Sequence, residues 1–276
     1  MKKDQLLTRR RALLGGVAAL GAAGAAGLLG LGAGGDPAAP AAPAAGAPAR
    51  RPLKPSTYRL QPLVGHGGPN ASRTLVRREP VLRMTGVGRT MVLTFDDGPD
   101  RRYTPDILST LRAYDVRAMF FVCGEMVVDN KDLLAEMAEE GHVVGNHTWS
   151  HPLLTELSRG RIRSEMERTS DVIEETYGER PRWFRAPYGA WNRSAFQLGA
   201  ELGMEPLAWT VDTLDWTEPG TRTIVDQVEN GAGPGVVVLS HDAGGDRSQS
   251  VRALRDYLPQ LLDDGYHITV PRRHQV

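Results

Sequence analysis

Short apolar runs alternate with longer amphipathic stretches from Arg89 onward, and this alternation limits the folds open to the chain. The runs are rich in β-branched and aromatic residues, which is typical of strands buried on both faces of a parallel sheet. We predict strands at Met91–Phe95, Ala118–Val122, His142–Val144, Trp183–Phe184, Leu207–Val211, Val236–Leu239 and His267–Val270. Seven strands separated by helices predict an α/β fold close to a (β/α) barrel, but short of eight units.

The amphipathic stretches between these runs have the 3.6-residue apolar spacing of helices that cover a sheet. Helices are predicted at Thr104–Tyr114, Lys131–Glu140, Arg159–Tyr177, Asn192–Leu202, Thr221–Gly231 and Ser248–Asp264. One helix after almost every strand is the connection that parallel strands require.

The first 88 residues have a different composition. Lys2, Lys3 and Arg9–Arg11 precede a Gly/Ala/Leu stretch, so residues 1–35 are predicted to be a twin-arginine export signal, or an uncleaved N-terminal anchor. Residues 36–57 are Ala/Pro-rich and indicate a linker. We expect residues 58–88 to be a lead-in that packs on a main domain formed by residues 89–276. We also expect export by the twin-arginine machinery to the cell envelope or the medium.

Charge and cysteine content exclude some partners and some chemistry. Lys+Arg and Asp+Glu are balanced at 33 each, so no nucleic acid is expected as a partner. The single cysteine, Cys123, rules out an intramolecular disulfide. Nothing in the sequence indicates an obligate protein partner.

Polar residues follow the ends of five predicted strands. In a barrel of this type the site is built from the loops at the C-terminal ends of the strands. The clusters are Asp96-Asp97, His147–His151, Arg185, Asp212–Asp215 and His241-Asp242. We therefore expect these side chains to converge at one mouth, as in an enzyme.

His147 and His151 are four residues apart, a spacing that places both imidazoles on one face of a helical turn. Such pairs also occur as ordinary polar loop residues. Asp97 adds a carboxylate, and a set of two His and one carboxylate suits Zn²⁺, or Co²⁺ or another divalent ion, with positions left open for water and substrate. The His-Glu-x-x-His zinc motif is excluded because Thr148 stands where the glutamate is needed.

Asp96 and Asp97 are adjacent, and neighbouring residues of a strand point in opposite directions. Both face one cavity only at a turn, which Gly98-Pro99 can supply. One interpretation is a pair of turn-favouring residues. The other gives them separate functions, with one ligating the metal and the other acting as general base on a water.

Five segments together resemble the motifs of the polysaccharide deacetylases, the NodB-homology family or carbohydrate esterase family 4. The segments are Thr94–Pro99, His147–His151, Arg185–Tyr188, Asp212–Trp216 and Leu239–Asp242. They occur in the family's order over roughly residues 89 to 270. The fold that the resemblance implies is a distorted, incomplete (β/α) barrel.

The resemblance also implies a role for each matching residue. It implies Asp96 as general base, His241 as general acid, Arg185 as the residue that orients Asp96, and Asp215 as the partner of His241. It implies Asp97, His147 and His151 as the metal ligands, most simply of Zn²⁺. It implies that Tyr188 serves the oxyanion through its backbone N–H, and that Trp216 and Leu239 wall the pocket for the acetyl methyl group.

The function implied is removal of N-acetyl groups from an amino-sugar polymer such as peptidoglycan or chitin, with release of acetate. The same machinery could remove O-acetyl groups from xylan. A non-catalytic carbohydrate-binding protein of the cell wall is the alternative from another class. Such a protein is expected to lack a catalytic side chain, whereas the residues matching the metal, acid and base positions are all present.

Overall fold

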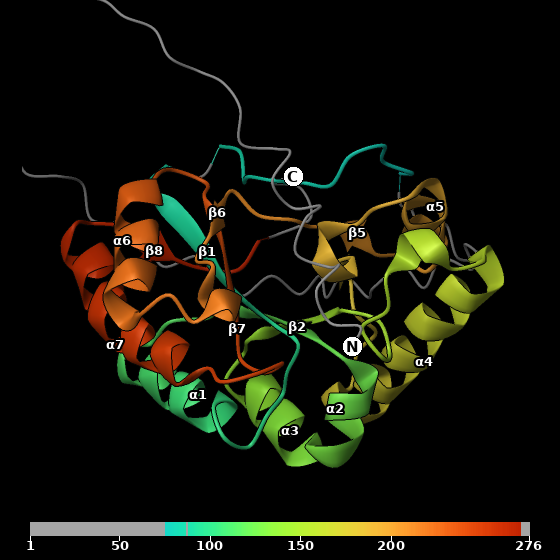
Figure 1. Ribbon diagram of the computed structural model, residues 1–276, viewed down its shortest axis with the longest axis horizontal. Helices are drawn as coiled ribbons and strands as arrows, with labels where there is room; N and C mark the ends of the chain where they lie inside the picture. The colour runs from blue at the N-terminus through green and yellow to red at the C-terminus, as the bar shows by residue number, and fades with distance from the viewer. Residues whose placement is uncertain (1–74, 87, 272–276) are drawn as a thin grey trace, which may run out of the picture. The chain divides into compact units, whose positions relative to one another are not determined.

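The computed structural model describes residues 75–86 and 88–271 (Figure 1). Its strands are β1 (Thr90–Asp96), β2 (Met119–Val122), β3 (Val143–Asn146), β4 (Trp183–Phe184), β5 (Glu205–Pro206), β6 (Val211–Asp212), β7 (Val237–His241) and β8 (His267–Ile268). They form one parallel sheet in the order β5-β4-β3-β2-β1-β7-β6, with β8 paired to the start of β1. The predicted fold class, a distorted and incomplete (β/α) barrel, is confirmed. The predicted export signal and linker lie outside the described residues.

β1 lies at the centre of the sheet. Its residues from Met91 to Asp96 are all buried, as the apolar run predicts for a strand covered on both faces. β1 pairs with β2 on one side and with β7 on the other, and Asp96 stands opposite Phe121 and His241. The C-terminal ends of these three strands therefore lie next to one another.

The predicted strand Leu207–Val211 is wrong, because the structure has two short strands there instead of one. β5 pairs with β4 at one edge of the sheet, whereas β6 pairs with β7 at the other edge. The residues between them change partners: the Leu207 N–H donates to the Phe184 carbonyl and the Thr210 N–H donates to the Val237 carbonyl. The apolar pattern shows that this segment is buried, but it does not show which strand each peptide group bonds.

The lead-in helps to close this side of the barrel. The Val81 N–H donates to the Pro206 carbonyl at 2.8 Å, and the Ala208 N–H donates to the Val81 carbonyl at 2.8 Å. Three residues later, the Met84 N–H donates to the Gly235 carbonyl at 2.8 Å. Backbone groups that would otherwise lack a strand partner are thus paired by the chain that precedes β1.

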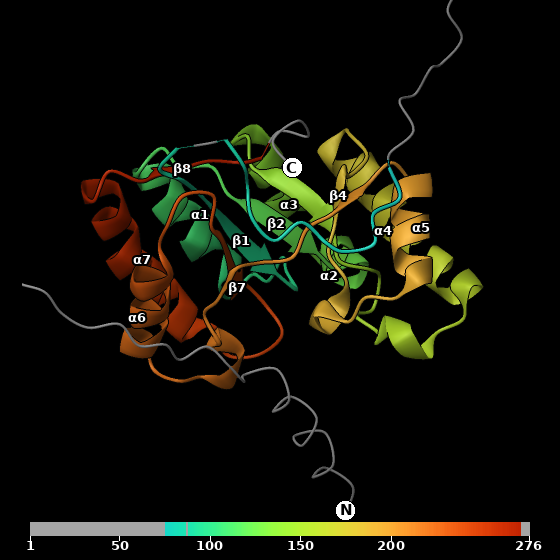
Figure 2. The same cartoon turned by 90° about the horizontal axis from the view of Figure 1, so that it is seen from above.

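Helices flank the strands on both sides, with α6 and α7 on one side and α4 and α5 on the other (Figure 2). The helices are α1 (Thr104–Ala113), α2 (Gly124–Asp129), α3 (Lys131–Glu139), α4 (Arg159–Tyr177), α5 (Arg193–Glu201), α6 (Thr221–Gly231) and α7 (Ser248–Asp263), with the 3₁₀ turns η2 (Leu154–Glu156), η3 (Pro187–Gly189) and η4 (Asp215–Thr217). All six predicted helices are present. The short α2 was missed, since it has six residues and its N-cap, Cys123, makes no side-chain capping bond.

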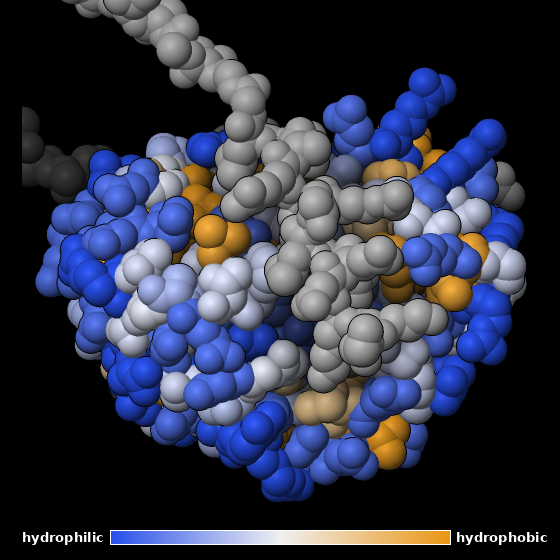
Figure 3. Space-filling view, in the orientation of Figure 1, coloured by the Kyte–Doolittle hydropathy of each residue, from blue (hydrophilic) through white to orange (hydrophobic). Residues whose placement is uncertain are grey.

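The surface drawn in Figure 3 is mainly hydrophilic over α6, α7 and α1. This agrees with helices that turn one apolar face toward the sheet and one charged face toward solvent. Among the described residues, no helix combines the length and the apolar character needed to cross a bilayer.

Candidate active site

Alternation along the central strands decides which polar residues face the interior of the barrel. In β1, Leu93 and Phe95 pack in the cluster beneath the helices, so Thr94 and Asp96 point to the opposite, interior side. In β7, Val238 belongs to the same outer cluster, so His241 also points inward. Two residues predicted as base and acid are thereby brought to the same side of the sheet from neighbouring strands.

Asp97 follows β1 with φ 78°, a left-handed conformation that is uncommon for a residue other than glycine. This turn reverses the usual alternation, so that the carboxylates of Asp96 and Asp97 both approach the same imidazole. Nε2 of His147 is 3.6 Å from Oδ2 of Asp96 and 3.5 Å from Oδ1 of Asp97.

The helical turn predicted for His147–His151 is wrong. The segment after β3 is an irregular loop, with φ 72° at Thr148 and φ 55° at His151. The two rings still approach each other, with centroids 4.9 Å apart. The prediction that the two imidazoles lie close together holds for a different geometric reason, since two left-handed residues bring the chain back toward β1.

Three ligand atoms, one each from Asp97, His147 and His151, lie within 4.8 Å of one another. Nε2 of His151 is 3.2 Å from Oδ1 of Asp97. Within the described residues this buried oxygen has no hydrogen-bond partner, as expected of a carboxylate oxygen that serves a cation. Two imidazoles and one carboxylate suit Zn²⁺ and Co²⁺, so these residues fit a divalent ion.

The protonation states of His151 and Asp97 also favour a metal site. Burial lowers the pKa of His151 to about 4, with a further contribution from His147, so the ring is neutral at neutral pH as a ligand must be. Burial opposes the charged form of Asp97, but the close approach of His147 and the positive charges that His241, His147 and His151 can carry hold the pKa of this carboxyl well below its usual range. Nδ1 of His147 lies 2.8 Å from the Arg185 carbonyl, which leaves Nε2 for the ligand set.

Arg185 is fully buried and orients Asp96. Its Nη1 donates to Oδ1 of Asp96 at 2.6 Å and to Oγ1 of Thr94 at 2.8 Å. Its Nε and Nη2 donate to the carbonyls of Leu207 and Ala208. Burial lowers the pKa of this guanidinium, although Asp96 opposes the shift. One oxygen of Asp96 is thus fixed by Arg185, while Oδ2 faces the ligand set.

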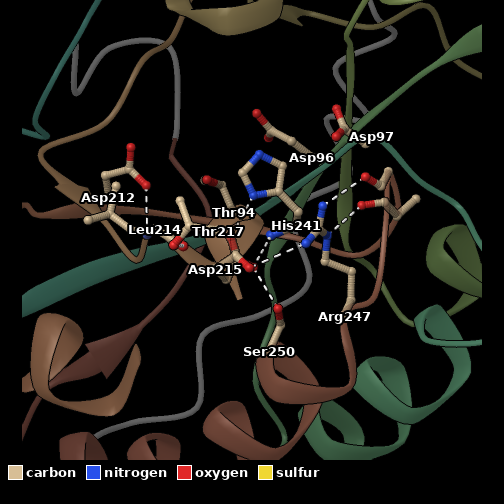
Figure 4. A network of polar contacts seen from close by, with 12 residues as sticks. Thr94, Asp96, Asp97, Asp212, Leu214, Asp215, Thr217, His241, Arg247 and Ser250 are labelled. Atoms are coloured by element: carbon tan, nitrogen blue, oxygen red, sulfur yellow. Dashed lines mark hydrogen bonds and ion pairs between the residues drawn. The ribbon is translucent and has the colours of Figure 1, made fainter. Parts of the chain in front are cut away.

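Asp215, in η4, holds the ring of His241 (Figure 4). Its Oδ1 lies 2.7 Å from Nδ1 of His241, and its Oδ2 accepts the backbone N–H of His241 at 2.8 Å. Oδ2 also accepts the Ser250 hydroxyl at 2.7 Å. With Nδ1 bound to Asp215, Nε2 is the ring nitrogen that is left to act on a substrate.

The pair has the charge distribution of a general acid and its counter-ion. Burial by itself lowers the pKa of His241, but the charge and hydrogen bond of Asp215, with Asp97 and Asp96, raise it to about 9. Burial also opposes ionisation of Asp215, yet the charge of His241 lowers the pKa of that carboxyl. The imidazolium is therefore the main form of His241 at neutral pH.

The three predicted substrate-binding residues stand in different settings. Tyr188 has φ 61°, and its half-exposed ring packs edge-on against His151 at 4.5 Å. Trp216 follows Asp215 in η4, and Leu239 is a buried residue of β7 opposite Thr94. Their roles in binding the oxyanion and the acetyl methyl group stay predictions.

Sequence reasoning missed several residues that support the site. Arg247 is buried and donates to the carbonyls of Ala243 at 2.7 Å, Gly244 at 2.9 Å and Asp215 at 3.3 Å (Figure 4). Ser250, from the first turn of α7, supports Asp215. No pattern in the sequence marks Arg247, because its acceptors are backbone carbonyls and not side chains.

The sequence does single out Asp242, because it stands next to His241 in one of the polar clusters that follow the strands. Alternation turns it away from the cavity toward α1, where its Oδ2 accepts the Thr104 hydroxyl at 2.6 Å. Burial raises the pKa of Asp242 to about 7, and the charges of Asp97 and Asp96 add to the shift. A Cβ on Gly98 would lie 2.2 Å from Oδ2 of Asp242, so this carboxyl also packs directly against the turn after Asp97.

Gly244→Ala is expected to destabilise the protein more than Gly203→Ala. Both glycines have positive φ, 75° and 78°, so both variants carry the same backbone penalty of about 1–2 kcal/mol. Only at Gly244 would the new Cβ lie 2.5 Å from Oδ2 of Asp97, while Gly203 has no atom within 4 Å. The overlap adds about 1–3 kcal/mol, which urea unfolding of both variants measures. Equal losses would show that Asp97 is not held by this contact.

A family model, related sequences and a solved structure all match this chain, and they indicate one family. Residues 84–207 match the family model described as polysaccharide deacetylase. A peptidoglycan-N-acetylglucosamine deacetylase of Bacillus cereus is 36% identical over 187 residues, which cover 67% of this chain and 68% of that protein. A chitooligosaccharide deacetylase of a Bradyrhizobium species is 38% identical over 199 residues, which cover 67% of this chain and 91% of that protein.

A solved structure shares the fold. The crystal structure of a peptidoglycan N-acetylglucosamine deacetylase in complex with 4-naphthalen-1-yl-N-oxidanyl-benzamide has a TM-score of 0.66 at 34% identity. The match covers 68% of this chain and 89% of that one. The chain therefore belongs to the polysaccharide deacetylase family of carbohydrate deacetylases, which confirms the resemblance inferred from its motifs.

Proposed function

We propose that the protein is an exported, metal-dependent deacetylase that hydrolyses N-acetyl groups of amino-sugar polymers, such as peptidoglycan N-acetylglucosamine or chitin oligosaccharides, and releases acetate. One observation carries this proposal. An Arg-fixed carboxylate, Asp96, and an Asp-fixed imidazolium, His241, stand at the ends of adjacent strands beside three side chains that fit a divalent ion.

Asp97, His147 and His151 would hold the ion. When bound, Zn²⁺ or a similar ion supplies Lewis acidity, since it polarises a carbonyl and lowers the pKa of water toward about 7. The remaining chemistry belongs to the side chains of the protein.

Hydrolysis of the amide needs a base for the attacking water and an acid for the leaving amine. Asp96 presents Oδ2 toward the ligand set, because Oδ1 is bound to Arg185, and Oδ2 can take a proton from water. His241 is an imidazolium at neutral pH and can give a proton to the sugar nitrogen as the carbon–nitrogen bond breaks. The products are acetate and a free amino sugar. Asp215 stabilises the charged ring before that transfer.

Substrate class and location are further parts of the proposal. The relatives named above include a deacetylase of peptidoglycan and one of chitooligosaccharides, which supports an N-acetylated glycan as substrate. The basic, then Gly/Ala/Leu-rich N-terminus supports export by the twin-arginine machinery, with the protein secreted or held at the cell envelope. Fractionation of cells that express the full chain tests the location, and purely cytoplasmic protein would contradict export.

The activity is tested by acetate release from peptidoglycan, chitin oligomers and acetylxylan, before and after chelation. We expect the N-acetylated glycans to be cleaved, the chelated protein to be inactive, and Zn²⁺ or Co²⁺ to restore the rate. The Asp96→Asn variant serves as a control, because metal addition should not rescue it. Activity that persists through complete chelation would contradict metal dependence. Preference for acetylxylan would favour O-deacetylation, and no acetate from any substrate would favour a non-catalytic glycan-binding protein.

A further inference from the structure

We propose that Glu165 of α4 is a positioning residue for the loop His147–His151, which it holds by accepting backbone N–H groups between the two histidines. This inference rests on the proposed metal site, because the expected consequence is a loss of metal affinity. Glu165 belongs to none of the five motifs and lies 14 residues after His151 in the sequence.

Within the described residues, the hydrogen bonds of the Glu165 side chain all go to this loop. Its Oε2 accepts the backbone N–H of Trp149 at 3.0 Å and that of Ser150 at 2.9 Å. The Ser150 hydroxyl donates to Oε1 at 3.2 Å. Glu165 is buried, and within the described part of the chain no ion pair reaches it. Its carboxylate therefore acts as an acceptor for the loop and not as half of a salt bridge.

Several other peptide groups of the loop are paired elsewhere. The Thr148 N–H donates to Oδ1 of Asn146, and the Thr148 carbonyl accepts the Gly124 N–H. The Trp149 carbonyl accepts the Glu125 N–H. Without Glu165, the N–H groups of Trp149 and Ser150 would lose the acceptor that completes this set, and the loop would have to relax toward solvent to satisfy them.

The same helix holds the Trp149 side chain. The guanidinium of Arg168, three residues after Glu165, lies 3.9 Å from the centroid of the Trp149 ring. The ring is also so close to Gly124 that a Cβ there would lie 2.3 Å from it. α4 thus fixes the central residue of the loop through both its backbone and its ring.

His151 depends on this support more than His147 does. Nδ1 of His147 is held by the Arg185 carbonyl, whereas His151 has no protein hydrogen bond of this kind within the described residues. Its ring is placed by packing against Tyr188 and by its backbone, which has φ 55° and follows the two residues bound by Glu165. A shift of that backbone would separate Nε2 of His151 from Oδ1 of Asp97.

The test measures Zn²⁺ affinity of the purified, metal-stripped full chain by competition with a chromophoric chelator. Glu165→Ala is expected to bind Zn²⁺ about tenfold more weakly than wild type, the usual size of an outer-shell effect. Glu165→Gln keeps an oxygen at the same reach and should recover most of the affinity. Glu165→Asp is one methylene shorter and should be intermediate. At saturating Zn²⁺ the turnover of these variants should return toward wild type, because acid and base are untouched.

Glu167→Ala is the matched control, since Glu167 lies on the same helix but is half-buried and, within the described residues, forms its ion pair with Arg163. The proposal is overturned if Glu165→Ala binds Zn²⁺ like wild type, or if Glu167→Ala weakens binding as much. Should Glu165→Ala fail to fold, equal affinities of the Asp and Gln variants would overturn it. Failure of the metal site itself is a separate result, in which wild type binds Zn²⁺ no better than His147→Ala.

Discussion

Asp96→Asn is expected to abolish turnover while Zn²⁺ binding stays intact. Asparagine keeps the shape of the side chain but cannot take a proton from water, so kcat/KM should fall by about 10²–10⁴-fold. Arg185 keeps its bonds to Thr94, Leu207 and Ala208 in this variant, which limits the structural damage. Acetate release and metal content, measured on the same preparation, check the prediction.

Asp97→Asn and His147→Ala give the contrasting result. Asp97→Asn removes the negative charge and one carboxylate oxygen, and His147→Ala removes an imidazole of the candidate ligand set, so metal content and turnover should be lost together. The two aspartates are adjacent, which makes them a matched pair for separating a base from a ligand. Equal loss of metal in Asp96→Asn and Asp97→Asn would mean that the two roles are assigned wrongly.

Asp215→Asn is expected to move the alkaline limb of the pH–rate profile to lower pH. Wild-type His241 has a pKa raised from 6.5 to about 9, so the protonated acid is present at neutral pH and is lost as the pH rises through about 9. Because the pKa of His241 is higher in the folded protein, protonation of its ring stabilises the fold. This contribution is fully present below about pH 6.5 and is lost as the pH rises through about 9. Loss of the Asp215 charge removes the largest cause that raises the pKa of His241, and burial, which lowers it, is then opposed only by the charges of Asp97 and Asp96.

The variant should therefore be nearly inactive at pH 8, with a loss of about 10²-fold or more in kcat/KM. Ser250→Ala is the control, because it removes one hydrogen bond to Asp215 and leaves the charge in place. Titration of His241 by NMR in the metal-free protein measures the shift directly. An unchanged pH–rate profile in Asp215→Asn would exclude His241 as a general acid whose protonated form is stabilised by Asp215.

Strand positions and helix positions were largely predictable because they follow from local periodicity. The apolar run in β1 predicts a buried central strand, and the predicted bounds of α4 and α6 agree with the structure. The prediction of one strand at Leu207–Val211 is wrong for a reason that the apolar periodicity does not reveal. Its residues are apolar and buried, but their peptide groups bond to β4, to the lead-in and to β7 in turn.

The sequence was enough to predict which polar residues stand at the strand ends that form the site. Asp96, Arg185 and His241 each come at the end of a strand, and parallel strands bring such positions to one edge. The geometry within the site was not predictable at the same level. The helical turn expected for His147–His151 is an irregular loop, because Glu165 and Asn146 offer its N–H groups better partners than a helix would.

The sequence by itself determined the fold class and the residues that belong to the deacetylase motifs, because both depend on local spacing. Only the tertiary structure decided how those residues are placed and charged. Asp97 reaches the two histidines through a left-handed turn, and Asp96 is fixed by an arginine 89 residues away. The ring of His241 is held and its protonated form stabilised because Asp215 is buried against it. These contacts join distant segments, and their charges are strong only where packing has removed water.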